Sequence, residues 1–356
     1  EKDGSWKHQL DAQNKLSTTI WDGKPDIYHA SQTLLLSNFR YSFAKTLKKQ
    51  TFNILVIGEL IVDITISDKG EKRYLGGSPC NVALTLSRLN MPPTLLTTYN
   101  PQDELGKFVN EKIDLDDIKI DLQINEQTNR SMVYLDDDFN ASYSFVYSSN
   151  ITPNSFDVDY LSLGSISAFQ LENNQSKKFQ DFTKKAHQAG VITFFDPNIR
   201  KEINPPYEIS KEIFNSYLPY IDYLKASNED IDFLYPNTDY FKVAINLFSL
   251  GIKLFILTKG ESGAILYYQE NKQVKSIALS CVLSKVIDTI GAGDSFMGAF
   301  IYYIIKYKPQ QNEKELKELL LFCLKVASIT VSREGANPPY LCELNDKTEC
   351  SVLTKQ

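Results

Sequence analysis

The chain has 356 residues, which is enough for one large α/β domain or two ordinary ones. Its 38 Lys and Arg against 44 Asp and Glu give a net charge of −6 with no strongly basic block, so nucleic-acid binding receives no support. No apolar run approaches the roughly 20 residues that cross a bilayer, and five cysteines without a Cys-x-x-Cys pair predict free thiols in a reducing compartment, hence a cytoplasmic globular protein with no membrane partner.

Residues 1–50 differ in character from the rest of the chain, and we predict an N-terminal extension of unknown role there. Leu35, Phe39, Phe43 and Leu47 recur every four residues, as on one face of a helix. This stripe favours a segment that packs against the main domain. A basic amphipathic presequence is the alternative, which two aspartates upstream of the stripe disfavour.

From residue 51 onward strands and helices alternate, which predicts one domain over 51–345 followed by a tail at 346–356. Strand-like segments are predicted at 54–66, 130–135, 142–147, 191–195, 222–226, 253–257 and 263–268. Helices are predicted at 78–89, 172–188, 239–250, 291–306 and 313–332. Alternating β and α units imply a mainly parallel sheet with helices on both faces.

Two pairs of extended segments, near 59–75 and 128–150, have no helix inside the pair. They predict a small separate sheet that projects from the main body. The acidic turn at 136–138 is best interpreted as a solvated hairpin tip rather than a metal site.

The helix near 78–89 follows a pair of glycines. Ser78 is predicted as its N-cap and Pro79 as its first residue. Gly76 and Gly77 let a ligand lie against bare backbone, and Asn81 offers a donor and an acceptor, which suits a polyhydroxyl ligand. Gly-Gly before a capped helix is also a common turn, so the motif by itself is weak evidence for a ligand site.

The segment DTIGAGDSFMGAF at 288–300 is a tight glycine turn that opens into an apolar helix. Gly291 and Gly293 let the backbone approach a ligand, and the N–H groups of the first turn form an anion site with the helix dipole. Asp294 lies inside that turn. Anion-stabilising N–H groups beside a base are what a hydroxyl needs to attack a phosphorus atom, so the pattern indicates phosphoryl transfer.

Three other interpretations of this turn must be weighed. Asp294 in a first helical turn could simply be a cap or a dipole partner. A Walker loop requires Lys-Ser or Lys-Thr after its last glycine, which is absent. The dinucleotide fingerprint requires a small residue where Phe296 stands and tolerates no acid against the pyrophosphate.

Together, the Gly-Gly-x-x-x-Asn segment and the Asp-Thr-x-Gly-Ala-Gly-Asp segment resemble those of the PfkB-type (ribokinase-like) carbohydrate kinases, over about residues 52–342. The resemblance implies a three-layer ribokinase-like α/β fold with a mainly parallel central sheet and a small β-strand lid. It also implies transfer of the γ-phosphoryl group of ATP to a primary hydroxyl, with Asp294 as the base. Gly291, Ala292 and Gly293 would stabilise the developing charge.

The same resemblance implies a sugar site made of Asp63, Gly76, Gly77, Asn81 and Arg200. For Asp63, a strand-end turn residue is the alternative. The segments LGSIS at 163–167 and FFDPNIR at 194–200 resemble the fructokinase branch of the family.

For the nucleotide, the resemblance implies contacts from two segments. The residues that carry it are Thr258, Gly260 and Gly263 under the phosphates, and Gly335, Ala336 and Asn337 beside the adenine. Asp230 would reach Mg²⁺ through water, although Ser227, three residues earlier, departs from the family's Asn and could instead cap a helix. Asp288 and Ile290, with residues 333–335, would form a loop for a monovalent cation such as K⁺.

The acceptor predicted from the sequence is a neutral ketohexose, with fructose to fructose 6-phosphate as the first candidate. The strand at 142–150 lacks the basic residue that 2-keto-3-deoxygluconate would need, and a phosphorylated sugar would need more cations than Arg200 and Arg130. Ribose, 2-keto-3-deoxygluconate and adenosine stay open as acceptors. So does a catalytically inactive scaffold or sensor of the same fold. A homodimer formed through the lid is a further expectation.

Overall fold

The computed structural model describes residues 8–10, 16–18, 52–67, 70–116, 118–135, 141–154, 157–281, 286–344 and 352–353. The chain divides into two units, Glu1–Thr51 and Phe52–Gln356. In the first, β1 (His8–Leu10) pairs with β2 (Leu16–Thr18) in antiparallel fashion. The predicted helical stripe at 35–47 and the acidic turn at 136–138 lie outside the described residues.

The second unit is built on a ten-stranded sheet with the order β16-β15-β14-β13-β12-β11-β10-β3-β6-β7. Every neighbouring pair from β13 to β7 is parallel, whereas β14, β15 and β16 join antiparallel. The strands are β3 (Ile54–Ile57), β6 (Thr94–Tyr99), β7 (Lys119–Ile124), β10 (Tyr160–Gly164), β11 (Ile192–Asp196), β12 (Tyr223–Ser227), β13 (Leu254–Thr258), β14 (Ala264–Glu270), β15 (Gln273–Cys281) and β16 (Val352–Leu353). The predicted mainly parallel sheet is therefore confirmed.

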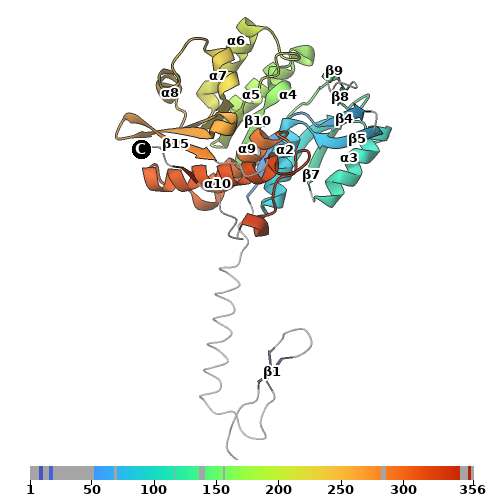
Figure 1. The fold of residues 1–356 in the computed structure, drawn as a ribbon, viewed down its shortest axis with the longest axis horizontal. Coiled ribbons are helices and arrows are strands. Elements are labelled where there is room, and N and C mark those ends of the chain that lie inside the picture. Colours follow the sequence, from blue (N-terminus) through green and yellow to red (C-terminus); the bar gives the residue numbers. More distant parts are fainter. Residues whose placement is uncertain are drawn as a thin grey trace, which may run out of the picture. The chain divides into compact units, whose positions relative to one another are not determined.

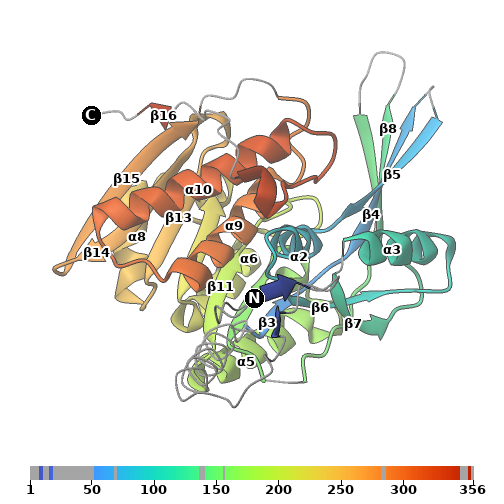
Figure 2. The same ribbon diagram turned by 90° about the horizontal axis from the view of Figure 1, so that it is seen from below.

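Helices cover both faces of this sheet, and two hydrophobic clusters lie between the layers (Figures 1 and 2). Residues of β3 alternate between them: Ile54 and Val56 enter one cluster, Leu55 and Ile57 the other, as the two-residue period of a strand requires. Cluster one contains α2 (Ser78–Arg88), α3 (Glu104–Leu115), α9 (Ala292–Tyr307) and α10 (Glu313–Val331). Cluster two contains α4 (Ser165–Phe169), α5 (Gln175–Gln188), α6 (Tyr207–Tyr217), α7 (Asn228–Leu234) and α8 (Tyr240–Ser249).

The predicted small sheet is present and projects from the main body (Figure 2). It has four strands in the order β5-β4-β8-β9, which are β4 (Ile61–Ser67), β5 (Gly70–Gly76), β8 (Arg130–Leu135) and β9 (Ala141–Val146). The two hairpins are antiparallel and join through a parallel β4–β8 pair.

Local differences from the predicted elements have physical causes. The N-cap of α2 is Gly77 at φ +92°, not Ser78, whose hydroxyl donates to Asp294 instead of capping the helix. The sequence prediction also omitted two helices with few buried residues: α3, in which Gly106, Val109 and Ile113 are buried, and α6, in which Ser210, Ile213, Phe214 and Tyr217 are buried.

Two bulk expectations can be compared with the described residues. No helix among them is both long and apolar enough to cross a membrane. In the same part of the chain, Cys80, Cys323 and Cys342 are free thiols.

Candidate active site

The first turn of α9 begins at a left-handed glycine. Gly291 is the N-cap with φ +75°, and a Cβ there would lie 2.5 Å from the Cβ of Ala336. Both conformation and space therefore require glycine at this position. The N–H of Ala292 donates to the carbonyl of Thr289 across 3.3 Å, while the following N–H groups lie where a helix has no acceptor of its own.

At Gly293, the absence of a side chain leaves room for a neighbouring lysine. Its backbone does not adopt the left-handed conformation, but a Cβ there would lie 3.1 Å from Nζ of Lys225. A lysine ammonium thus lies directly against the first turn of α9. Sequence reasoning assigned both glycines to ligand approach and did not single out Lys225.

Asp294 accepts three hydrogen bonds from two separate segments, α2 and the loop after β11. Ser78 Oγ donates to Oδ1 at 2.7 Å, Asn81 Nδ2 donates to Oδ2 at 2.8 Å, and Asn198 Nδ2 donates to Oδ1 at 3.3 Å. The side chain is buried, and none of these donors belongs to its own helix. The carboxylate is therefore held from outside α9 and does not act as a cap of that helix.

The helices that carry the two motifs pack closely, because α9 has a glycine at the contact. A Cβ on Gly298 would lie 2.6 Å from Cβ of Thr85 on α2. Figures 1 and 2 both show α2 and α9 side by side. This close packing brings the start of α2, with Ser78 and Asn81, against the start of α9.

Asp63 lies on β4 and accepts a hydrogen bond from Ser131 Oγ. A Cβ on Gly76 would lie 2.1 Å from Asp63 Oδ2, so the predicted glycine leaves room for this carboxylate. Burial raises the pKa of Asp63, and the Asp294 carboxylate raises it further. The Ser131 hydrogen bond and the Arg200 charge lower that pKa, but the net shift is upward. Asp63, Asp294 and Arg200 therefore interact electrostatically across one region.

Gly77 and Glu59 lie where β4 leaves the main body. Gly77 has φ +92°, and a Cβ there would lie 2.5 Å from the carbonyl oxygen of Glu59. The Glu59 side chain is buried, accepts from the Ser167 N–H at 3.1 Å and leaves Oε1 without a partner among the described residues. Burial raises the pKa of Glu59.

Arg200 follows β11 in the predicted DPNIR segment and is exposed. Its N–H donates to Asn204 Oδ1 at 2.6 Å, but its guanidinium has no hydrogen bond or ion pair within the part of the chain that the structure describes. It is a cation available to an incoming anion.

A buried ion pair lies beside the Asp294 cluster. Lys225 Nζ is 2.8 Å from Asp196 Oδ2, and the side chains are 3% and 4% exposed. Burial raises the pKa of Asp196 to about 7 even though Lys225 opposes the shift. Burial alone would lower the pKa of Lys225, but Asp196, Asp230 and Asp294 outweigh it and hold that pKa above its usual value. The signal was in the sequence: a lysine inside the buried strand YLKAS.

Asp230 and Ser227 form a capping box at the start of α7. Asp230 Oδ2 accepts from the Ser227 N–H and hydroxyl, and Oδ1 accepts from the Ile199 N–H at 2.7 Å. The described residues contain no group of three or more His, Cys, Asp or Glu that could hold a metal ion. The donor set therefore does not fit a direct protein cage for Mg²⁺, although Asp230 Oδ1 retains a lone pair for one water.

The residues predicted for a monovalent cation meet beside Gly291. Asp288 Oδ1 accepts from the Ile290 N–H at 3.0 Å, and Asp288 Oδ2 accepts from the Gly335 N–H at 2.9 Å. Ala336 follows Gly335 in the chain, and its side chain occupies the space that a Cβ on Gly291 would need. The predicted nucleotide residue Asn337 accepts from Arg88 Nη1 at 2.6 Å.

The remaining predicted nucleotide residues lie at the carboxyl end of β13. Thr258 is the cross-strand partner of Ser227 on one side and of Ala264 on the other. Gly260 and Gly263 both have positive φ, and a Cβ on Gly263 would lie 2.1 Å from the Leu279 carbonyl. They therefore follow the same sheet edge as Asp196 and Ser227, which end β11 and β12.

The small sheet contacts the segment at 333–337, which we call the 333–337 loop. Tyr74 on β5 donates its hydroxyl to Glu334 at 2.6 Å, and Lys72 forms an ion pair with the same carboxylate at 2.5 Å. A Cβ on Gly335 would lie 3.0 Å from the Tyr74 ring. Because Tyr74 is the cross-strand partner of Asp63, the sheet that carries the predicted sugar residue also contacts this loop.

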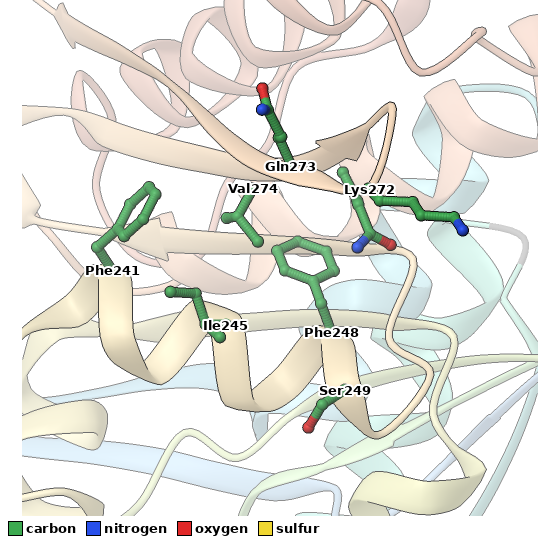
Figure 3. A pocket seen from close by; sticks show the side chains of 8 residues that line it. Phe241, Ile245, Phe248, Ser249, Lys272, Gln273 and Val274 are labelled. Carbon is green, nitrogen blue, oxygen red and sulfur yellow. The ribbon is translucent and has the colours of Figure 1, made fainter.

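A groove of about 550 Å³ lies elsewhere, between α8 and the β14–β15 hairpin (Figure 3). Phe241, Ile245 and Phe248 line it from the helix, and Val274 and Lys272 from the hairpin. The turn of that hairpin is at the opposite end of the sheet from the carboxyl ends of the parallel strands. The groove is therefore separate from the Asp294 cluster.

Comparison with known proteins identifies relatives. The profile of the "pfkB family carbohydrate kinase" matches residues 51–341. The chain is 25% identical to an ATP-dependent 6-phosphofructokinase of Thermoanaerobacterium thermosaccharolyticum over 74% of this chain and 85% of that protein. It is 27% identical to probable fructokinase-2 of Arabidopsis thaliana over 85% of this chain and 94% of that protein.

Solved structures share the fold at low identity. A fructokinase of Xylella fastidiosa with bound ATP has a TM-score of 0.70 at 20% identity and covers 82% of this chain and 97% of its own. A fructokinase double mutant of Vibrio cholerae, in a fructose, ADP and potassium ion bound form, has a TM-score of 0.67 at 21% identity, with 80% and 94% covered.

Proposed function

The chain belongs to the pfkB family of carbohydrate kinases, phosphotransferases with sugar hydroxyl acceptors, and we propose that it transfers the γ-phosphoryl group of ATP to a primary hydroxyl of a neutral sugar, with fructose to fructose 6-phosphate as the first candidate. The observation that carries this proposal is the convergence of Ser78, Asn81 and Asn198 on the Asp294 carboxylate. Three donors fix that carboxylate beside unpaired helix N–H groups, as a base for a bound hydroxyl requires.

In the proposed mechanism, Asp63 and Asn81 bind sugar hydroxyls and Asp294 orients the reacting one. The acceptor oxygen attacks the γ-phosphorus, so one P–O bond forms while the bond to the β–γ bridging oxygen breaks and its electrons leave with ADP. The hydroxyl proton passes to Asp294. A carboxylate is a weak base for an alcohol, but a loose transition state needs little early deprotonation, so positioning contributes more.

Charge on the transferred group would be stabilised at the start of α9. The N–H of Gly293 has no acceptor within its helix, and the N–H of Ala292 joins it once its 3.3 Å bond to Thr289 is given up. Gly291 provides the left-handed turn that aims these groups. Arg200, whose guanidinium has no partner among the described residues, is the cation that we assign to the end of the acceptor that receives the phosphoryl group.

A neutral acceptor is supported by the charges on the small sheet. Lys72 is paired with Glu334, and Arg73 is paired with Glu71 and with Glu104. Neither cation is left for a second phosphate or a carboxylate on the sugar. The guanidinium of Arg130 on β8 contacts only the Gln127 amide oxygen among the described residues, and Arg200 and Arg130 would be a weak site for a phosphorylated acceptor.

We propose Mg²⁺ and a monovalent cation as cofactors. When bound, Mg²⁺ would supply charge neutralisation to the phosphates of ATP, and Asp230 is the carboxylate that we propose to reach it through a water. Backbone carbonyls near Asp288, Ile290 and Gly335 are the proposed ligands of a monovalent cation such as K⁺. Replacing K⁺ by tetramethylammonium should lower activity if that site is used, and unchanged activity would contradict it.

We also propose a homodimer through the small sheet. The four strands form an open layer, and Phe145 on β9 is 41% exposed. Sedimentation of the protein and of Phe145→Asp tests this: a dimer that the variant dissociates supports it, and a monomeric native protein rejects it.

The function is tested by ADP release from ATP and Mg²⁺ with fructose, ribose, adenosine, 2-keto-3-deoxygluconate and fructose 6-phosphate, the last because one relative is a 6-phosphofructokinase. We expect fructose-dependent turnover that falls about 10²–10⁴-fold in Asp294→Asn while ATP binding persists. Turnover with another acceptor would correct the substrate. ATP binding without turnover on any acceptor would favour the scaffold or sensor, and equal loss of binding and turnover in Asp294→Asn would reject its role as base.

A further inference from the structure

Lys225 is a cation in the interior of the main sheet. It lies on β12 between Leu224 and Ala226, both fully buried, and its own side chain is 3% exposed. Removing an ammonium from water is costly, and replacing such a pair by apolar residues often stabilises a protein. Packing alone therefore gives no reason for a lysine here.

The ammonium is only partly satisfied by the protein. It has three N–H donors, and Asp196 Oδ2 is its only hydrogen-bond acceptor within the described residues. Asp196 is itself buried, and its Oδ1 has no partner in that part of the chain. Lys225 and Asp196 therefore hold each other in place, while N–H donors of the ammonium and Oδ1 of the carboxylate remain without a partner among the described residues.

The ammonium also lies at the amino end of α9, where the helix dipole makes a cation unfavourable. Its Nζ is 3.1 Å from the Cβ position of Gly293, against the first turn of α9, where the helix dipole is positive. Asp196, Asp230 and Asp294 offset that repulsion. The free N–H groups of α9 and the ammonium thus concentrate positive charge at one point, which only a ligand with several negative charges would use fully.

We propose that Lys225 supplies positive charge to the transferred phosphoryl group from beneath Gly293, and that Asp196 is the positioning residue that holds the ammonium there. This inference rests on the proposed kinase function. Lys225 stays protonated throughout: it moves no proton, which passes to Asp294, and it stabilises the charge that spreads over the non-bridging oxygens during transfer.

The role is distinguishable from a structural ion pair because only the γ-phosphoryl group should sense it. Loss of the charge should weaken binding of ATP but leave binding of ADP nearly unchanged. A structural pair would instead lower thermal stability and change the affinities of ATP and ADP together.

Because Lys225→Met leaves a buried carboxylate unpaired and can disturb folding, the variant to use is the double Lys225→Met, Asp196→Asn, which removes both charges. The matched control is Lys211→Met, which removes a half-buried lysine that donates to the Leu234 carbonyl on another element. Calorimetry would measure the dissociation constants of ATP and ADP with Mg²⁺, and melting would report the fold.

We expect the double variant to bind ATP about tenfold more weakly with little change for ADP, since hydrogen bonds to charged groups are worth at least this factor. The Lys211→Met ratio should equal that of the native protein. An unchanged ATP-to-ADP ratio in a folded double variant overturns the inference. A native protein that binds no ATP would reject the proposed kinase function instead, so the two failures are distinct.

Discussion

Asn81 Nδ2 donates to Asp294 Oδ2 across 2.8 Å, although 213 positions separate the two residues in the chain. The bond joins the first turn of α2 to the first turn of α9. It places an amide donor beside the carboxylate that we propose as the base, so changes at Asn81 should alter catalysis.

Asn81→Asp should slow catalysis. The new carboxylate has the shape of the amide, but it cannot donate a hydrogen bond to Asp294 and carries the same charge. We expect kcat/KM to fall about tenfold or more, as loss of a hydrogen bond to a charged group predicts. Asn110→Asp, which adds the same charge on α3, is the control, and an equal loss in the two variants would contradict the assigned role.

Gly76→Ala should impair acceptor binding selectively. The backbone at Gly76 suits any residue, but the methyl group would lie 2.1 Å from Asp63 Oδ2 and must displace that carboxylate. We expect the KM for the sugar to rise about tenfold or more, as loss of a charge-assisted hydrogen bond predicts, with ATP binding unchanged.

Gly70→Ala on the same strand is the matched control. Its φ of +110° makes alanine strained there, but, apart from its chain neighbours, no atom of the described residues lies within 4 Å of the added methyl group. It should cost about 1–2 kcal/mol of stability and leave the sugar KM unaltered. A similar KM change in both variants would indicate a general distortion of the sheet.

Glu59→Gln should change how stability depends on pH. Burial raises the pKa of Glu59 above its value in the unfolded chain, so the folded protein binds more protons and its stability falls as the pH rises from about 4.5 through the folded pKa. Glutamine mimics the protonated form. We expect the variant to gain stability relative to the native protein between pH 5 and pH 8.

Denaturant unfolding at those two pH values measures the effect, and Glu202→Gln at an exposed position is the control. A stability difference between Glu59→Gln and the native protein that is the same at both pH values would show that Glu59 does not titrate differently on folding.

Asp230 and Ser227 can be separated by their metal dependence. Ser227→Ala removes one half of the capping box and should lower the free energy of unfolding by about 1 kcal/mol without changing the Mg²⁺ requirement. Asp230→Asn should raise the Mg²⁺ concentration for half-maximal activity, since we propose a water-mediated contact. An unchanged requirement in Asp230→Asn would leave the residue with its capping and Ile199 contacts alone.

The fold could be predicted from the sequence because its signals are local. The alternation of β3 residues between two cores and the left-handed Gly291 both follow from rules that apply within a few residues. The small sheet followed from paired strands with no helix between them. α3 and α6 were missed because few of their residues are apolar and buried.

The contacts of the site were harder to predict because they depend on distant partners. The rule for caps assigned Ser78 to its own helix, but its hydroxyl is used by Asp294 from α9. Lys225 appears as one charge in an apolar strand, and only the folded chain shows that it meets Asp196 and Gly293. Tertiary partners decide the role of such polar residues, and the local pattern does not contain them.

The contact of Tyr74 and Lys72 with Glu334 has a consequence for the order of events. If the small sheet swings outward to admit a sugar, Glu334 loses both partners and the Tyr74 ring leaves Gly335, whose N–H is bonded to Asp288. Opening thus removes contacts from the 333–337 loop, and closure over a bound sugar restores them. By thermodynamic reciprocity, each substrate should then favour retention of the other by the same factor. Since Lys72 and Glu334 are 63% and 58% exposed, that factor should be small and should shrink with added salt.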